Sequence, residues 1–176
     1  NRKTQAILPL RGKIINVVSS ASDKVAANQE ISDLQLALGC QTGARFKLEA
    51  LRYQRIVIMT DADVDGAHIA ALLITFFFTS MPELIHAGRL YLAQPPLFRL
   101  TQGSHTLYAR DEIHRDQLLR DEFKGSAKVD IGRFKGLGEM TPAQLKTTTM
   151  DPGVRTLARV IIPEDGLPTV EALVET

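Results

Sequence analysis

The clearest hydrophobic pattern in the chain is a strand followed by a long apolar helix. Residues 56–60 form a continuous and mostly β-branched run, which predicts a strand covered on both faces, as in parallel sheets. From Ala67 to His86 apolar residues recur at helical spacing, and Pro82 indicates a kink or the start of a new helix. The local architecture is therefore a strand, a short turn that begins at Asp61, and a helix.

The segment before this strand predicts two short helices. An apolar run from Ala6 to Val18 is broken by Pro9 and basic residues, which indicates an extended segment with a basic loop inside it. Apolar residues at near-helical spacing follow Ser22, and Gly39 ends the pattern. Residues 42–52 are polar and irregular, which predicts a loop.

The segment after the long helix predicts a mixture of strands and helices. Gly88 closes the helix, two strands are expected between 89 and 100, and a hairpin strand at 106–109. Asp111 is expected to cap a helix that runs to Phe123. The remaining expected elements are a Gly-rich basic loop at 133–140, a helix opened by Thr141-Pro142, and a strand at 157–162.

Composition and charge add limits to this picture. The 176 residues are 44% hydrophobic and 23% charged, which is typical of a globular chain with one sizeable core. The net charge of +1 does not indicate nucleic-acid binding by the whole chain. The first 22 residues, however, contain no Asp or Glu and four basic residues: Arg2, Lys3, Arg11 and Lys13.

Cysteine content and hydropathy bear on the compartment. Cys40 is the only cysteine, which excludes an intrachain disulfide and a thiolate metal cluster and predicts a reducing compartment, the cytoplasm. No run reaches the roughly 18 apolar residues of a membrane helix, so no membrane partner is expected. The first residue is Asn1 rather than methionine, so the chain is expected to be part of something longer.

Three carboxylates follow the predicted strand, at Asp61, Asp63 and Asp65, and Gly66 comes directly after them. Like charges this close repel one another, so the cluster is costly without a cation, and a hard ion such as Mg²⁺ suits carboxylate oxygens. The alternative is a solvated acidic turn whose carboxylates cap the following helix.

Two other templates compete for the same spacing. An EF-hand loop begins in the same way but needs a carboxylate at its twelfth position, where this chain has Leu72, and it needs a preceding helix. A phosphatase with a strand-end aspartate nucleophile needs a later acidic pair, and the only one after a predicted strand is Glu164-Asp165. The first template is excluded and the second is disfavoured.

Four segments together resemble one family, the B subunits of bacterial type II DNA topoisomerases. They occur in the order expected for that family and span nearly the whole chain. The segments are Gln5-Ala6-Ile7-Leu8-Pro9-Leu10-Arg11-Gly12-Lys13-Ile14, Ile58-Met59-Thr60-Asp61-Ala62-Asp63-Val64-Asp65-Gly66-Ala67-His68-Ile69, Gln94-Pro95-Pro96-Leu97-Phe98 and Arg133-Phe134-Lys135-Gly136-Leu137-Gly138-Glu139-Met140.

The resemblance implies an α/β fold: a Toprim domain, with a Rossmann-like parallel sheet and helices on both faces, plus a short C-terminal tail. The expected division is 1–100 for the metal- and DNA-binding Toprim domain and 101–176 for the tail packed on it. Residues 19–30 and 107–110 look more like topoisomerase IV than gyrase, and gyrase is the close alternative. A non-catalytic module that docks DNA or the partner subunit is a further alternative.

The resemblance also implies roles for individual residues. Asp61 and Asp63 are expected to be catalytic and to ligate Mg²⁺ directly, with Mn²⁺ or Ca²⁺ able to substitute in binding. Asp65 is expected to act through water or as a neighbouring acceptor. The predicted DNA contacts are Arg11, Lys13, Asn16, His68, Arg133 and Lys135.

Each of these contacts has a plainer alternative. Arg11 and Lys13 could equally be ordinary solvent-exposed side chains. The Asn16 side chain could equally form a hydrogen bond with the backbone. His68 could instead cap or pack against its helix. The 133–140 loop could instead be a turn with a purely structural role.

In the resembled family the cleaving tyrosine belongs to the A subunit of an A2B2 heterotetramer that acts on double-stranded DNA. Tyr53, Tyr91 and Tyr108 are therefore expected to be structural. A Glu-Gly-Asp-Ser motif upstream of the first matching segment completes the family's metal site, so this chain is expected to hold half an active site and to be inactive alone. ATP is expected to bind elsewhere in the parent subunit. The parent protein is expected to work in the bacterial cytoplasm, in association with the chromosome.

Overall fold

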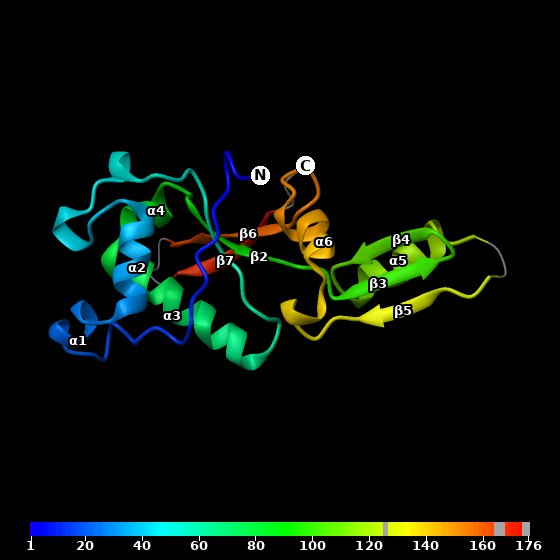
Figure 1. Cartoon of the computed structure of the whole chain (residues 1–176), viewed down its shortest axis with the longest axis horizontal. Coiled ribbons are helices and arrows are strands. Elements are labelled where there is room, and N and C mark those ends of the chain that lie inside the picture. Colours follow the sequence, from blue (N-terminus) through cyan, green and yellow to red (C-terminus); the bar gives the residue numbers. More distant parts are fainter. Residues whose placement is uncertain (125–126, 164–167, 174–176) are drawn as a thin grey trace. The chain divides into compact units, whose positions relative to one another are not determined.

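The computed structural model describes residues 1–124, 127–163 and 168–173, without the side chains of 170–173. The α-helices in Figure 1 are α1 (Ser22–Ala26), α2 (Gln29–Leu38), α3 (Val64–Ser80), α4 (Pro82–His86), α5 (Glu112–Asp121) and α6 (Pro142–Leu145). The strands are β1 (Ile56–Ile58), β2 (Leu90–Ala93), β3 (Phe98–Gln102), β4 (His105–Ala109), β5 (Asp130–Arg133), β6 (Leu157–Ile161) and β7 (Thr169–Leu173). Short 3-10 turns are η1 (Gly43–Arg45), η2 (Leu48–Ala50) and η3 (Leu137–Glu139), and η4 (Lys146–Met150) is a π-helix.

The described chain divides into two compact units. The first contains Asn1–Ile58, His68–Tyr91 and Arg159–Glu171. The second contains Met59–Ala67 and Leu92–Ala158, together with Ala172 and Leu173. The acidic turn after β1 and the Gly-rich loop at 133–140 therefore belong to the same unit.

A four-stranded sheet has the order β1-β2-β6-β7. Its mixture with helices confirms the α/β class expected from the sequence. The expectation of a strand at 56–60 covered on both faces is only partly met: β1 ends at Ile58, and Ile56 and Val57 are half-buried. The reason is the edge position of β1, which leaves it with one neighbouring strand. That the strands run parallel, with helices on both faces, stays a prediction.

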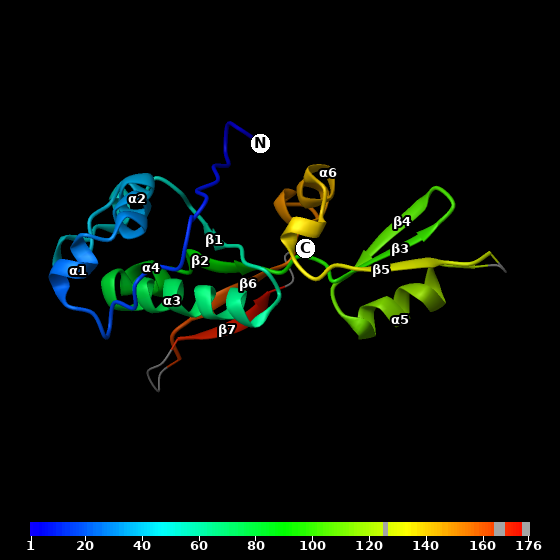
Figure 2. The ribbon, with the colours of Figure 1, turned by 60° about the horizontal axis from the view of Figure 1, so that its bottom comes forward.

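The second sheet lies wholly within the second unit and has the order β4-β3-β5. β3 and β4 form the predicted hairpin, with antiparallel pairing from Phe98↔Ala109 to Gln102↔His105 around Gly103, whose φ of 63° suits glycine. β5 adds to the other side of β3 in antiparallel register. Helix α5 lies beside this sheet, as Figures 1 and 2 both show.

Apolar packing in the first unit centres on α3 and α4. Phe76 and Phe77 are almost completely buried, and their rings meet edge to face with centroids 5.4 Å apart. Leu72 is also buried, and it occupies the position where an EF-hand loop would need a carboxylate. α3 runs without a break to Ser80, and Pro82 then starts α4 at its first position. The prediction that Pro82 marks a kink or a new start is confirmed.

Most other element predictions are confirmed. Asp111 caps α5, which ends at Asp121 rather than Phe123, and Thr141 forms a capping box with Gln144 at the start of α6. The region 42–52 contains two 3-10 turns instead of an irregular loop. β5 and β7 were not predicted, although polar and apolar residues alternate at Lys128-Val129-Asp130-Ile131 and at Thr169-Val170-Glu171-Ala172.

The cap of α2 provides a small and measurable test of local stability. The Asn28 side chain accepts a hydrogen bond from the backbone N–H of Ile31 at 3.0 Å. We expect Asn28→Ala to lower the free energy of unfolding by about 1 kcal/mol. Asn28→Asp should keep the stability, because aspartate caps equally well. Chemical denaturation of both variants checks this, and equal losses for the two would contradict it.

Two further observations concern membrane spans and the single cysteine. Within the described ranges, no helix combines the length and apolar character needed to cross a bilayer. Cys40 is a buried, unbridged thiol, and this burial raises its pKa.

Candidate metal and DNA site

The acidic turn joins the end of β1 to the start of α3. Asp61, Asp63 and Asp65 are all exposed. The Oδ1 atom of Asp63 accepts a hydrogen bond from the backbone N–H of Gly66 at 2.7 Å, and its carbonyl accepts from Ala67 at 3.0 Å. Asp63 therefore caps α3, as the capping alternative predicted, and its negative charge lies at the positive end of the helix.

Glycine is required at position 66 because the backbone of Asp61 lies against it. A Cβ built on Gly66 would overlap the carbonyl oxygen of Asp61 and lie 2.9 Å from its carbonyl carbon. Both atoms belong to the backbone and have no freedom to move away without opening the turn. The tight turn that presents the carboxylates thus depends on the absence of a side chain at this position.

Asp61 is held by a segment far away in sequence. Its Oδ1 atom accepts a hydrogen bond from the backbone N–H of Leu137 at 2.7 Å, across 76 residues of chain. A carboxylate acceptor makes this bond shorter and stronger than one between neutral groups. Residue 136 lies so close that a Cβ there would be 2.9 Å from both Cγ and Oδ1 of Asp61.

The turn matches Mg²⁺ in the chemistry of its donors. Exposed carboxylate oxygens are hard ligands, and Mg²⁺ in proteins commonly takes one or two carboxylates, with waters and substrate phosphates completing its coordination. Among the described residues, no three His, Cys, Asp or Glu side chains are grouped so as to hold a metal ion. A divalent ion at this turn would therefore need ligands beyond the described carboxylates.

Two predicted DNA contacts lie in the same unit as the acidic turn. Arg133 ends β5 and is exposed, with its guanidinium 5.9 Å from the centroid of the Phe98 ring. Lys135 is also exposed, and its backbone N–H donates to Glu139 Oε2 at 2.8 Å. Both cations are therefore accessible to a phosphate, on a loop whose backbone is held in place.

The other four predicted DNA contacts lie in the first unit: Arg11, Lys13, Asn16 and His68. All four are exposed. The backbone N–H of Arg11 donates to Glu30 at 3.3 Å, which leaves its guanidinium outside that bond. Asn16 Oδ1 accepts from the backbone N–H of Val18 at 3.0 Å. This is the backbone hydrogen bond that the sequence left open for Asn16, and it favours a structural role there.

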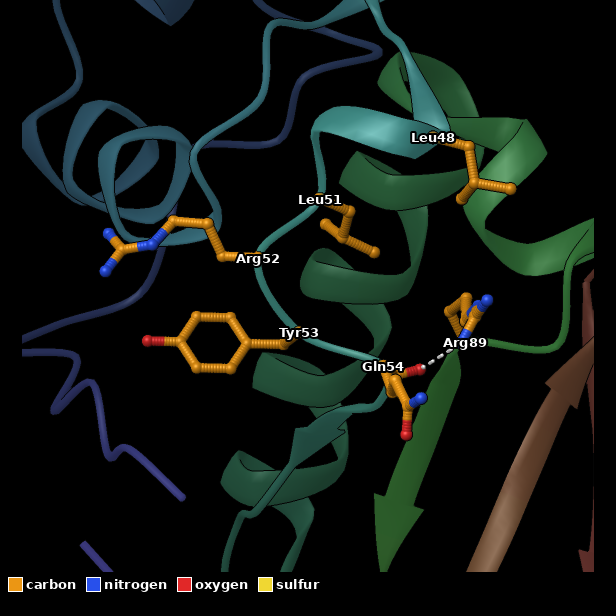
Figure 3. A pocket seen from close by; sticks show the side chains of 6 residues that line it. All are labelled: Leu48, Leu51, Arg52, Tyr53, Gln54 and Arg89. Carbon is orange, nitrogen blue, oxygen red and sulfur yellow. Dashed lines mark hydrogen bonds between the residues drawn. The ribbon is translucent and has the colours of Figure 1, made fainter. Parts of the chain in front are cut away.

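Neither of two pockets in the structure is lined by a residue of the acidic turn. The smaller, of about 120 Å³, is shown in Figure 3, where Arg89 donates from Nη1 to the carbonyl of Gln54 at 3.2 Å. None of the predicted site residues lines it. The larger, of about 430 Å³, is lined partly by Phe98, Ile113 and Arg133.

The three tyrosines are divided between the two units. Tyr53 and Tyr91 lie in the first unit, where each ring lies under an arginine guanidinium, and Tyr91 is buried in β2. Tyr108 lies in the second unit, within β4 and opposite Arg99. These positions agree with the expected structural roles.

The sequence did not indicate the partnership of Asp61 with Gly136 and Leu137. The sequence left two interpretations of the 133–140 loop open, a basic loop that contacts DNA and a structural turn. One usable signal was present, because glycine in an ordered loop often marks a close approach of other atoms.

Comparison with known families identifies the domain that carries this acidic turn. The chain belongs to the Toprim family: residues 1–95 match the Toprim domain, whose members bind Mg²⁺. Residues 126–176 match a second family, described as the DNA gyrase B subunit, carboxyl terminus.

Among named relatives, the chain is 63% identical over all 176 residues to the B subunit of DNA topoisomerase 4 from Caulobacter vibrioides. It is 64% identical over 162 residues, 92% of the chain, to the protein of the same name in Bartonella bacilliformis. It is 49% identical over 164 residues, 93% of the chain, to the B subunit of DNA gyrase from Halalkalibacterium halodurans. The chain spans 25%, 23% and 26% of these three relatives, about a quarter of each.

Proposed function

We propose that the chain is the Toprim and tail region of a B subunit of bacterial topoisomerase IV, an ATP-dependent type II DNA topoisomerase. The observation that carries this proposal is the 63% identity, over every residue of the chain, to the B subunit of a DNA topoisomerase 4. In this proposal residues 1–100 form the metal- and DNA-binding domain and residues 101–176 the tail.

The acidic turn is the proposed catalytic centre. Asp61 and Asp63 supply anionic oxygens to Mg²⁺, and Asp65 binds through water or orients a neighbouring ligand. A Mg²⁺ ion held there would stabilise the negative charge that develops on the leaving sugar oxygen during DNA cleavage. The support for this assignment is the exposure of the carboxylates and the hydrogen bond that holds Asp61.

The exposed cations are the proposed backbone contacts to double-stranded DNA. Lys135 and Arg133 lie on the loop that also holds Asp61, so phosphate binding there would bring the DNA backbone to the metal ligands. Arg11, Lys13 and His68 are proposed to bind phosphates without regard to sequence. Asn16 is the weakest member of this set, because its side chain already bonds the backbone.

The assembly proposed is an A2B2 heterotetramer in which the A subunit carries the cleaving tyrosine. ATP binds to another part of the B subunit, and the protein works in the bacterial cytoplasm on the chromosome. This chain alone is then expected to leave DNA intact.

A decatenation assay tests the proposal. We expect the complete subunit that contains this chain, combined with its A subunit, ATP and Mg²⁺, to unlink catenated DNA circles and to relax supercoils. The same mixture should leave relaxed circles without negative supercoils. Introduction of negative supercoils would assign the chain to gyrase, the alternative favoured by its 49% identity to a gyrase B subunit.

A docking module without catalysis is a different class of function, and metal dependence separates it from the proposal. The docking alternative predicts that the assembled protein binds DNA equally with and without a divalent ion and that the acidic residues are dispensable for cleavage. Calorimetry with Mn²⁺ on the complete subunit measures divalent binding directly. Absence of such binding would remove the physical basis of the catalytic assignment.

A further inference from the structure

The contact between Asp61 and the Gly-rich loop joins two segments that are separated by 76 residues but lie in one compact unit. The N–H of Leu137 donates to Asp61 Oδ1 at 2.7 Å. A carboxylate held at one oxygen by a fixed donor loses much of the rotational freedom that an exposed aspartate otherwise has. Its second oxygen is then presented in a restricted set of directions.

Gly136 is required by this contact for reasons of space rather than of backbone conformation. Its φ of −165° is extended and suits any residue. A Cβ at this position would nevertheless lie 2.9 Å from Cγ and Oδ1 of Asp61 and 3.2 Å from Oδ2. Real Cβ contacts are almost never that short, so a side chain here would push the carboxylate aside. A Cβ on Gly138, two residues later, would meet nothing within 4 Å.

The loop that holds Asp61 is itself anchored at both ends. Near the start of the loop, Phe134 N–H donates to the carbonyl of Leu97 at 2.8 Å. In its middle, Glu139 accepts from Lys135 N–H at 2.8 Å and donates its own N–H to the Gly136 carbonyl at 3.2 Å. At its last residue, the Met140 side chain is buried. The Leu137 N–H is therefore a fixed donor rather than the tip of a freely moving loop.

We propose that Gly136 and the backbone N–H of Leu137 are positioning residues that hold the Asp61 carboxylate for divalent-ion binding. This inference rests on the proposed function of Asp61 as a metal ligand. Carboxylates that ligate metals are usually oriented by hydrogen bonds from groups that do not touch the ion, and loss of such a partner commonly weakens binding. Gly136 contributes by leaving space, and Leu137 by donating its N–H.

A pair of glycine variants tests the positioning role. We expect Gly136→Ala to weaken the affinity of the complete subunit for Mn²⁺ and Mg²⁺ roughly 10-fold or more, measured by calorimetry. Gly138→Ala adds the same methyl group to the same loop where no atom opposes it, and should bind as the wild type does. Equal affinities for the two variants would overturn the proposal.

Thermal melting without metal separates positioning from folding. Because the added methyl of Gly136→Ala meets the end of an exposed side chain, we expect a melting temperature close to that of Gly138→Ala. If Gly136→Ala fails to fold, hydrogen exchange at the Leu137 amide in two aspartate variants tests the contact between Leu137 and Asp61 instead. Asp61→Ala should speed exchange there, whereas Asp63→Ala, which removes a cap within the acidic turn, should leave it unchanged.

The outcomes also separate this inference from the proposed function. If the wild type fails to bind any divalent ion, both the metal role of Asp61 and its positioning are refuted. If the wild type binds the ion and Gly136→Ala binds it equally well, only the positioning is refuted. If Leu137 exchanges at the same rate in Asp61→Ala as in the wild type, the contact itself is refuted, whatever the enzyme does to DNA.

Discussion

Asp63→Asn in the assembled enzyme is expected to lower DNA cleavage by about 100-fold or more while leaving the melting temperature of the protein nearly unchanged. Asp63 has two functions that this substitution separates. It caps α3 through Oδ1, and it is a proposed ligand of Mg²⁺. Asparagine keeps an oxygen in the place of Oδ1 and is among the best capping residues, but it carries no charge to attract the ion.

The expected size follows from what a metal supplies in catalysis. Charge stabilisation by a bound ion is worth several kcal/mol in a transition state, and each 1.36 kcal/mol changes the rate tenfold. Loss of about 3 kcal/mol of this stabilisation corresponds to a cleavage rate reduced roughly 100-fold.

Asp63→Ala provides the matched comparison. It should lose cleavage as Asp63→Asn does and also lower the free energy of unfolding by about 1 kcal/mol, because the cap of α3 is gone. Cleavage is measured on supercoiled DNA with the A and B subunits present and Mg²⁺ in excess. Undiminished cleavage by Asp63→Asn would remove Asp63 from the site, even if the decatenation assay succeeds with the wild type.

Gly66→Ala is expected to lower the free energy of unfolding by about 1–2 kcal/mol and the melting temperature by roughly 2–8 °C. Two effects oppose each other at this position. Alanine is favoured over glycine within a helix by about 1 kcal/mol. The new Cβ, however, would overlap the backbone carbonyl of Asp61, and overpacking of this kind costs about 1–3 kcal/mol.

The net change in stability is a loss because the atoms that oppose the new methyl belong to the backbone. A flexible side chain could rotate away from the new methyl, as Asp61 does in the Gly136→Ala case, whereas a backbone carbonyl moves only with the whole turn. Gly66→Ala should therefore also weaken Mn²⁺ binding, because the turn carries Asp61 and Asp63. Thermal melting and calorimetry measure the two effects, with Gly138→Ala as the control. A melting temperature equal to that of the control would show that the turn relaxes freely.

Local pattern was enough to predict the elements that surround the site. The β-branched run at 56–60 and the apolar spacing after Ala67 placed the acidic turn between a strand and a helix, and the structure confirms that placement. Capping residues also act within a few positions of themselves, so Asp111 and Thr141 were predicted correctly. The strand β5 was missed: its alternating run is short, and its pairing with β3 is a contact between distant segments.

The candidate site shows the same division. The sequence alone predicted which residues carry the chemistry, since the spacing of Asp61, Asp63 and Asp65 is a property of one short segment. Only the tertiary structure decided what holds Asp61 and why residue 136 has no side chain. That contact spans 76 residues, and its geometry depends on how a whole compact unit packs, which no local pattern encodes.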